Sequence, residues 1–235
     1  LASHGARELD PVPELPAADA PVTASGYAGA RALLQAGGVA FAGAATVTTD
    51  RDAIEAAERL GYPVVVKALG LLHKSDAGGV VVGVRDEEAL RTALADLRAR
   101  LQPAALSIEE MAPVADGVEL LIGARCDPRF GPVALAGLGG LFTETLRDVA
   151  VALAPVDEEQ AHRLLLSLRA APLLLGARGR PPMDVPAAAR ALAALSRVAA
   201  AHPEIAEIEV NPLLVLPDGA LALDARVVLA PEDAP

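Results

Sequence analysis

Cysteine, aromatic residues and positive charge are scarce in this sequence, and each scarcity argues against a class of protein. One cysteine among 235 residues, Cys126, allows no intrachain disulfide, and we interpret it as a reduced structural residue of a cytoplasmic protein. Aromatic residues make up 2% of the chain and Trp is absent, so no stacking platform for single-stranded nucleic acid is expected. The formal net charge of −11 supplies no basic face for duplexes. We therefore expect no nucleic-acid partner.

Long apolar stretches are missing as well. No run reaches the ~18 residues of a membrane span, and no signal peptide with a basic start is visible, so no membrane partner is expected. The chain does not begin with Met, which suggests processing, trimming or excision from a longer polypeptide. Residues 1–21 contain Pro11, Pro13, Pro16 and Pro21 and predict an extended linker. Such a linker suggests that another domain precedes it.

The rest of the chain carries alternating helical and extended patterns. It is 53% hydrophobic, mostly Ala, Val and Leu, which suits one large domain or two small lobes that share a cleft. Helices are expected from residue 27 to the glycines at 37–38, behind Thr49 or Asp50 to Gly61, behind Asp86 to Pro103, at 158–170 and at 186–201. Strands are expected at 64–66, 80–84, 106–111, 118–124 and 132–136, with a final hairpin of 205–216 and 220–229. This mixture predicts an α+β fold.

Lysine is the rarest basic residue. Only two of the 20 Lys and Arg residues are lysines, Lys67 and Lys74, and both lie within one eight-residue window. The lysine ammonium is a compact point charge that commonly binds phosphate. Because Lys67 follows the buried strand 64–66, its ammonium is expected to emerge at the edge of a cleft. A solvated surface lysine is the alternative at both positions.

A glycine-rich loop connects the two strands that flank these lysines. The backbone amides of Gly78 and Gly79 can cradle phosphate oxygens, although the order of residues differs from a Walker A loop and a plain hairpin turn would look similar. His73 lies in the same loop, and a neutral imidazole can carry a phosphoryl group. From the residues alone, an exposed histidine that only forms hydrogen bonds is the preferred interpretation.

A second cluster of polar residues lies in the C-terminal hairpin. Asn211 is the only Asn of the chain, and strand alternation places Glu209 on the same face. Asp224 lies on the returning strand, which can bring it close to Asn211. Mg²⁺ prefers oxygen ligands and commonly combines one or two protein groups with water and phosphate. The hairpin therefore predicts a magnesium site, with polar residues at a wet strand edge as the alternative.

The strand expected at 106–111 can serve as a hinge between two lobes. Its last residues, Glu109, Glu110 and Met111, would offer backbone groups and an apolar wall to an adenine ring. Glu119, on the next strand, could accept hydrogen bonds from ribose hydroxyls. A partly exposed strand without a ligand is the alternative.

Together these segments resemble the ATP-grasp domain of NDP-forming acyl-CoA synthetases, with ADP-forming acetate–CoA ligase as the nearest type. The resemblance covers roughly residues 25–230 and keeps the order of the family. The matching segments are 61–67, 73–80, 117–123, 127–132, 137–140 with Glu144, 176–179, and 209–213 with Asp224.

The resemblance implies an ATP-grasp fold whose two lobes clasp ATP or ADP, with a linker at 1–21 and lobes at 22–105 and 106–235. It places Lys67 near the phosphates, beside Lys74 and the Gly78-Gly79 loop. It implies that Asn211 and Asp224 are Mg²⁺ ligands, with Glu209 nearby. It also makes His73 a candidate phosphate carrier. In such enzymes the phosphoryl group passes between an acyl phosphate and ADP through histidine. The reaction needs a CoA-binding partner domain or subunit, and the oligomeric state is left open.

Two departures from the family pattern bear on catalysis. The run from Lys67 to His73 is about two residues shorter than in common members, which affects the reach of His73. An arginine expected near Ala152 is absent, which affects catalytic competence. One alternative is a regulatory ATP-grasp-like domain of a protein acetyltransferase. Another is the β chain of succinyl-CoA synthetase, which fits 209–213 and Asp224 but not the loop around His73.

Overall fold

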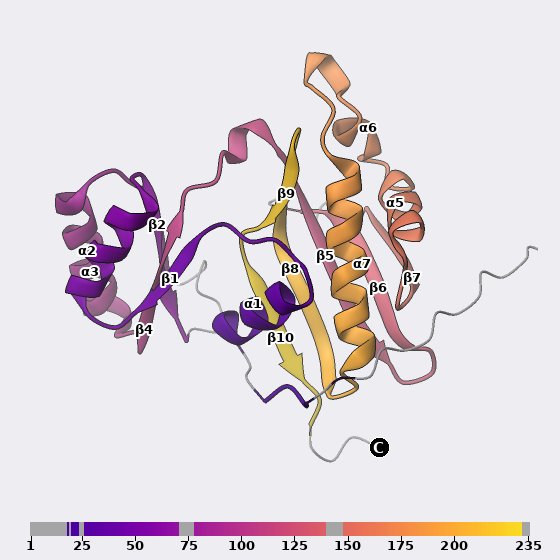
Figure 1. The fold of residues 1–235 in the computed structure, drawn as a ribbon, viewed down its shortest axis with the longest axis horizontal. Helices are drawn as coiled ribbons and strands as arrows, with labels where there is room; N and C mark the ends of the chain where they lie inside the picture. Colours follow the sequence, from indigo (N-terminus) through magenta and orange to yellow (C-terminus); the bar gives the residue numbers. More distant parts are fainter. Residues whose placement is uncertain (1–17, 19, 24–25, 71–77, 140–147, 232–235) are drawn as a thin grey trace, which may run out of the picture.

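The chain folds into two lobes that lie side by side (Figure 1). The computed structural model describes residues 18, 20–23, 26–70, 78–139 and 148–231. The small lobe is a four-stranded antiparallel sheet in the order β1-β4-β2-β3, with two helices packed on it. Its elements are β1 (Ala44–Val47), α2 (Asp50–Leu60), β2 (Val64–Leu69), β3 (Val80–Val84), α3 (Glu87–Leu101) and β4 (Ala105–Glu110).

The two helices of the small lobe begin at the capping residues that the sequence indicates. The Thr49 side chain accepts a hydrogen bond from the Asp52 amide at 3.1 Å, and the Asp86 carboxylate accepts one from the Ala89 amide at 2.8 Å. Opposite them, Val64, Val66 and Ala68 of β2 are fully buried in the small-lobe core. Since side chains alternate along a strand, Lys67 lies on the other face of the sheet, toward the large lobe.

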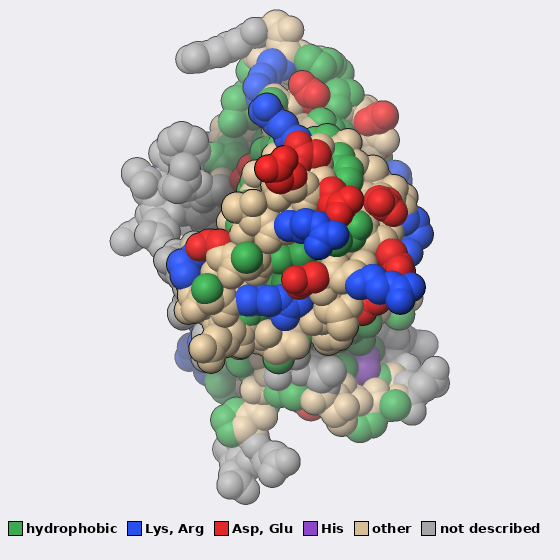
Figure 2. Space-filling model, turned by 90° about the vertical axis from the view of Figure 1, so that its left-hand side faces the viewer, with side chains coloured by type: hydrophobic (Ala, Val, Ile, Leu, Met, Phe, Trp, Pro, Cys, Tyr) green, Lys and Arg blue, Asp and Glu red, His purple; other side chains and the backbone are tan. Residues whose placement is uncertain are grey.

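The outer surface of the small lobe carries charges of both signs. Figure 2 shows acidic and basic side chains interspersed on the face that α2 and α3 form. Several are ion pairs one helical turn apart, which stabilise a helix only slightly. These pairs are Arg51–Glu55, Arg91–Glu87 and Arg100–Asp96.

The large lobe is a six-stranded sheet, β10-β8-β5-β6-β7 with β9 paired to β8, and every pairing is antiparallel. Its strands are β5 (Val118–Asp127), β6 (Gly131–Leu138), β7 (Val149–Leu153), β8 (Ile205–Leu216), β9 (Gly219–Ala222) and β10 (Ala225–Leu229). Its helices are α1 (Tyr27–Ala36), α5 (Glu158–Leu166), α6 (Ala171–Leu174) and α7 (Val185–Ala201). The short turns η1 (Val114–Asp116) and η3 (Ala177–Gly179) complete the described elements.

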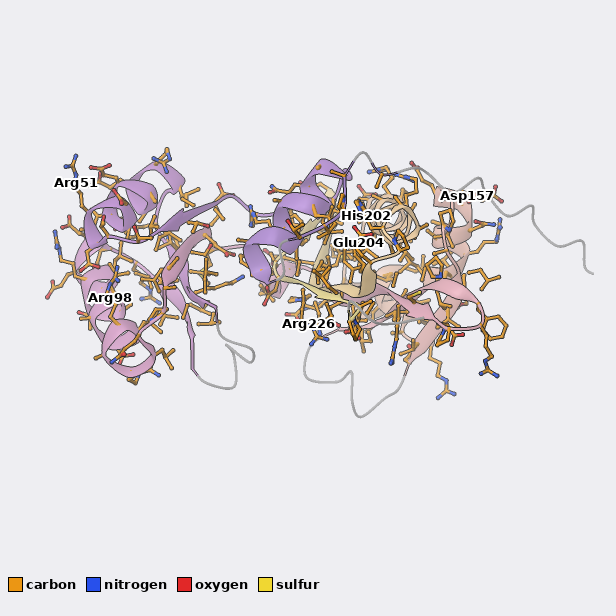
Figure 3. The ribbon with its side chains drawn as sticks, turned by 90° about the horizontal axis from the view of Figure 1, so that it is seen from below. Arg51, Arg98, Asp157, His202, Glu204 and Arg226 are labelled. Atoms are coloured by element: carbon orange, nitrogen blue, oxygen red, sulfur yellow. The ribbon has the colours of Figure 1, made fainter. Side chains whose placement is uncertain are left out.

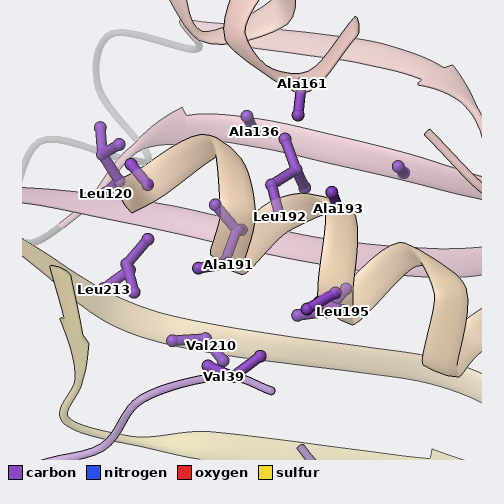
Figure 4. Close-up of a cluster of buried hydrophobic side chains, with 14 of the residues drawn as sticks. Val39, Leu120, Ala136, Ala161, Ala191, Leu192, Ala193, Leu195, Val210 and Leu213 are labelled. Atoms are coloured by element: carbon purple, nitrogen blue, oxygen red, sulfur yellow. The ribbon is translucent and has the colours of Figure 1, made fainter. Parts of the chain in front are cut away.

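Helix α7 is the main helix of the large-lobe core. Figure 4 shows Leu192 and Leu195 of α7 against the sheet strands that carry Leu120, Ala136 and Leu213. All five side chains are completely buried. In the described part of the chain, the helices of this lobe pack on this face of the sheet. The opposite face is open and carries exposed side chains such as Val151 and Leu153. No helix of that part is long and apolar enough to cross a membrane.

Two predicted elements differ from the structure. The helix expected at 158–170 ends at Leu166, because the Asp148 carboxylate accepts hydrogen bonds from the Arg169 and Ala170 amides at 2.9 and 2.7 Å and redirects the chain. The return strand expected at 220–229 is two strands, β9 and β10, interrupted at residues 223–224. The interruption turns a regular hairpin into a corner that holds Asp224.

The division between the lobes also differs from the predicted boundary at residues 105 and 106. Strand β4 pairs with both β1 and β2 and so belongs to the small lobe. Helix α1 belongs to the large lobe, because its Ala30 and Leu34 are buried in the α7 core. The small lobe is thus residues 44–110, inserted between α1 and the rest of the large lobe. Hydrophobic pattern alone does not indicate which sheet a strand joins.

Candidate functional site

Lys67 occupies the centre of the interface between the lobes. It lies within β2, two residues before the strand ends at Leu69, and is 7% exposed. Its ammonium lies 2.8 Å from Glu109 Oε2 and donates to the Leu223 carbonyl oxygen at 2.6 Å. Strand β2 thus continues past Lys67, and the ammonium, expected to emerge at the edge of a cleft, is buried at the interface instead. The side chain faces the opposite lobe, as a cleft residue should, but it is buried among partners.

Glu109 is the main partner of Lys67. Predicted as a hinge residue beside adenine, it is 3% exposed and its carboxylate also accepts the Ser107 hydroxyl at 2.7 Å. The Tyr27 hydroxyl of α1 lies close enough to this carboxylate for its charge to act on it. The Tyr27 ring centroid lies 5.1 Å from the Lys67 ammonium, within cation–π range. Sequence reasoning missed Tyr27, because nothing in the pattern of α1 indicates that one of its residues reaches the small lobe.

The hinge strand ends in a shallow open pocket of about 310 Å³. Glu110 and Met111, both predicted nucleotide residues, lie in its wall. The Glu110 carboxylate accepts a hydrogen bond from the Gly43 amide at 2.8 Å, and Met111 is 43% exposed. The volume lies at the low end for small-molecule sites. The remaining lining residues come from both lobes: Ala42, Leu60, Gly61, Tyr62, Pro63, Ala112, Pro113 and Leu221.

Asn211 and Asp224 are adjacent, as the hairpin pattern predicted. The Asn211 amide donates to the Asp224 carbonyl oxygen at 3.1 Å, next to the β8–β10 pair of Val210 and Ala225. The Asp224 carboxylate accepts a hydrogen bond from the Ala225 amide at 2.8 Å. Asn211 is exposed. An amide oxygen and a carboxylate at one corner suit a hard cation such as Mg²⁺.

Glu209 lies on the same strand but is paired with an arginine. Arg226 Nε is 3.2 Å from its carboxylate and also bonds Glu207. Figure 3 shows Arg226 on the side of the sheet away from α7. Burial raises the pKa of Glu209, and repulsion from Glu207 and Asp224 adds to the effect, while Arg226 opposes it. Its carboxylate is thus already engaged by the Arg226 side chain.

The remaining predicted residues are distributed around this centre. Glu119 is half-buried on β5, between the core residues Val118 and Leu120, so alternation turns it to the open face of the sheet. Gly78 and Gly79 lie beside β2, where the Gly79 carbonyl accepts from the Ala68 amide at 2.7 Å. His73 and Lys74, the other two predicted phosphate ligands, lie outside the described residues, as does Glu144.

Ala152, near which an arginine was expected, lies on β7 of the large lobe. Ala152 pairs with Ala134 on β6 and packs against the large-lobe core, while its neighbours Val151 and Leu153 are 62% and 55% exposed on the open face. Apolar side chains therefore occupy the exposed positions of this strand. Within the described residues, no group of three or more His, Cys, Asp or Glu could hold a metal ion.

The structure thus brings the two predicted clusters together across the interface. Lys67 and Leu223 are 156 positions apart in sequence, yet one hydrogen bond joins them. Asp224 is the next residue along the chain, and Asn211 is bonded to it. Lys67 and the Asn211–Asp224 corner consequently lie close together across the lobe interface.

Curated relatives are ligases that act on CoA. The chain is 38% identical over 189 residues to the β subunit of acetate–CoA ligase (ADP-forming) I of Pyrococcus furiosus, covering 77% of this chain and 81% of that subunit. It is 38% identical over 211 residues to a trans-feruloyl-CoA synthase of an unknown prokaryotic organism, covering 85% of this chain. The chain spans 30% of that synthase.

Solved structures also match this chain in sequence and in fold. ACD1 of Candidatus Korarchaeum cryptofilum, in complex with coenzyme A, has a TM-score of 0.81 and 35% identity over 87% of this chain and 92% of that one. A dinucleotide-forming acetyl-coenzyme A synthetase 1 of the same organism has a TM-score of 0.77 at the same coverage. That structure contains coenzyme A and Mg-AMPPCP, and its phosphohistidine segment points towards the nucleotide binding site. The family model described as an ATP-grasp domain matches residues 19–229. The chain therefore belongs to the ATP-grasp family and is a homologue of the β subunits of ADP-forming acetate–CoA ligases.

Proposed function

We propose that this chain is the Mg-nucleotide-binding domain of an ADP-forming acyl-CoA synthetase, in which a phosphoryl group passes between a phosphohistidine and ADP or ATP. The observation that carries the proposal is the approach of Lys67 to the Asn211–Asp224 corner, through the 2.6 Å bond to Leu223. A nucleoside diphosphate needs such a cation and such a metal site side by side. The relatives, ADP-forming ligases of the same fold, support this reading.

The hinge pocket suits the base. We assign the adenine ring to the wall formed by Glu110 and Met111, with the ribose near Glu119 on the open face of β5. Lys67 then lies at the phosphate end, with Lys74 and the Gly78-Gly79 backbone as further phosphate ligands. Glu109 drops out as a backbone ligand of adenine, since its backbone lies inside the sheet, paired with Ala44 of β1 and Val65 of β2.

Asn211 and Asp224 would hold the magnesium ion, and Glu209 would lie beside it. Two protein oxygens are few for such an ion, so phosphate oxygens and water would complete its coordination. Bound there, Mg²⁺ neutralises charge on the phosphates during transfer. This local positive charge also explains how a chain of net charge −11 attracts an anion.

We assign His73 as the phosphate carrier at the nucleotide site. Lys74, the next residue in the sequence, would supply positive charge for a phosphohistidine. The CoA and acyl groups would bind a partner domain or subunit, since two of the relatives are more than three times as long as their match to this chain. We place the assembled enzyme in the cytoplasm.

Calorimetric titration with ADP and ATP, with and without Mg²⁺, tests the proposal. Micromolar binding, roughly −8 kcal/mol, is expected only with Mg²⁺. Lys67→Ala should weaken Mg-ADP binding roughly 10- to 100-fold through the loss of a charge-assisted hydrogen bond, and Asp224→Ala should abolish the dependence on Mg²⁺. Arg51→Ala, on the outer face of α2, is the matched control. No binding at millimolar nucleotide to the folded chain would overturn the proposal.

A second measurement separates an enzyme from a regulatory domain. Incubation of the chain and its CoA-binding partner with acyl-CoA and inorganic phosphate should yield acid-labile phosphate that His73→Ala removes. Mg-ADP binding without such phosphate would instead indicate a regulatory ATP-grasp domain.

A further inference from the structure

A network of buried polar side chains joins the two lobes at Lys67. Glu109 and Ser107 belong to the small lobe, whereas Tyr27 and Leu223 belong to the large lobe. The ammonium of Lys67 contacts Glu109 on its own sheet and reaches the Leu223 carbonyl across the interface. The Tyr27 ring lies against the same ammonium from α1. The network therefore crosses from one lobe to the other at Lys67 and Tyr27.

Tyr27 contacts both members of the ion pair. Its hydroxyl lies close enough to Glu109 for the charge of that carboxylate to act on it, and it accepts a hydrogen bond from Arg31 at 3.0 Å. Arg31 is itself fixed, since it donates to the Ala42 carbonyl and its guanidinium lies 4.9 Å from the Phe41 ring centroid. Burial raises the pKa of Tyr27, and the charge of Glu109 adds to this effect. The hydroxyl therefore keeps its proton beside the carboxylate.

These contacts restrict where the ammonium can go. A lysine side chain has a flexible four-carbon stem and three N–H donors. Glu109 and Leu223 engage the ammonium on two sides, and the Tyr27 ring lies over it. The ammonium is thereby held beside the residue that precedes Asp224, and a phosphate bridging the two lobes would meet it there.

We propose that Tyr27 is a positioning residue for the phosphates of a nucleoside diphosphate or triphosphate, acting through Glu109 and Lys67. The inference rests on the proposed nucleotide site and adds a residue of α1 to it. Tyr27 fixes the carboxylate, the carboxylate fixes the ammonium, and the ammonium meets the phosphate. The ring itself restrains the ammonium from the side of the large lobe. Tyr27 makes no contact with the base in this arrangement.

A double-mutant cycle with Mg-ADP distinguishes this role from a purely structural one. Tyr27→Phe removes the hydroxyl and should weaken Mg-ADP binding roughly 3- to 10-fold. Tyr27→Leu also removes the aromatic ring and should weaken binding by about a further 3-fold. In the Lys67→Met background both substitutions should have no further effect, because the side chain that Tyr27 positions is gone. Gln35→Ala, an exposed change on the same helix, is the matched control.

Equal losses in the wild-type and Lys67→Met backgrounds would overturn the inference and leave Tyr27 as a lobe-packing residue. Failure of the unaltered chain to bind Mg-ADP would instead overturn the proposed function. The two failures are therefore distinguishable in one set of titrations.

Lysine-selective NMR gives a readout that needs no nucleotide. The chain has two lysines, so an ammonium-detected spectrum of the full chain contains at most two side-chain signals. The Lys67 signal, assigned by its loss in Lys67→Met, should be visible at neutral pH because burial slows its exchange with water. It should broaden or vanish in Tyr27→Leu. A signal unchanged in position and width in that variant would contradict a positioning role.

Discussion

Glu109 illustrates at the residue scale how a buried carboxylate is tolerated in the small lobe. Lys67, Ser107 and Tyr27 all surround it, so its oxygens have partners in place of water. Removing one member of such a pair leaves the other charge buried and uncompensated. The same contacts that prepare the site therefore contribute to the stability of the chain.

Replacing Glu109 by Ala should lower the free energy of unfolding by about 3 kcal/mol, since Lys67 loses its counter-ion inside the protein. The double variant Glu109→Ala/Lys67→Met should lose less than the single variant, because no unpaired charge remains. Urea unfolding measures both. Glu55→Ala, which breaks an exposed pair on α2, should change stability little. A double variant that loses as much as the sum of the single variants would contradict this account.

Glu209 should make stability depend on pH in a defined direction. The pKa of Glu209 is raised in the folded chain, chiefly by burial. The contribution of Glu209 to stability is therefore present below the unfolded pKa and is lost as pH rises through the folded pKa. Glu209→Gln should therefore be more stable than the unaltered chain at pH 7, with the difference shrinking toward pH 4. Thermal unfolding at a series of pH values checks this, and a difference that grows at acid pH would contradict it.

Among the elements, β5 and β8 approach each other closely at Gly123. A Cβ on that residue would lie 2.9 Å from the Ile208 carbonyl oxygen, a backbone atom that cannot easily move. Gly123→Ala should push the strands apart beside Glu209 and lower stability by about 1–3 kcal/mol. Mg-ADP binding should weaken as well, since Asn211 lies two residues further along β8. Cys126→Ser, an exposed change on β5, should leave both measurements unaltered.

Local signals in the sequence predicted most helices and strands, but they did not predict the contacts between the lobes. Thr49, Asp86 and Asp157 cap helices as expected, because a cap depends on neighbouring residues only. The proximity of Asn211 and Asp224 followed from the hairpin. The partners of Lys67 could not be predicted, because Glu109, Tyr27 and Leu223 reach it through sheet register and lobe packing.

At the scale of the whole molecule, each lobe has its own hydrophobic core. The two clusters of buried residues have no member in common. Leu94→Ala, in the core of the small lobe, should cost about 3 kcal/mol and speed amide hydrogen exchange in β1 to β4. Exchange in β5 and β8 should stay close to that of the unaltered chain, because their side chains pack on α7 instead. Uniformly faster exchange in both lobes would show that the lobes unfold as one unit.

The insertion of the small lobe has a consequence for how the chain folds during synthesis. At its entry and exit, the Glu110 amide donates to the Gly43 carbonyl oxygen and the Gly43 amide donates to the Glu110 carboxylate, which holds its two ends together. Every strand of its sheet is therefore available once residue 110 has been made. Helix α1 is synthesised before the small lobe, yet the partners it packs on, α7 and β10, are synthesised after it. The apolar face of α1 must therefore stay uncovered until β10 has been made.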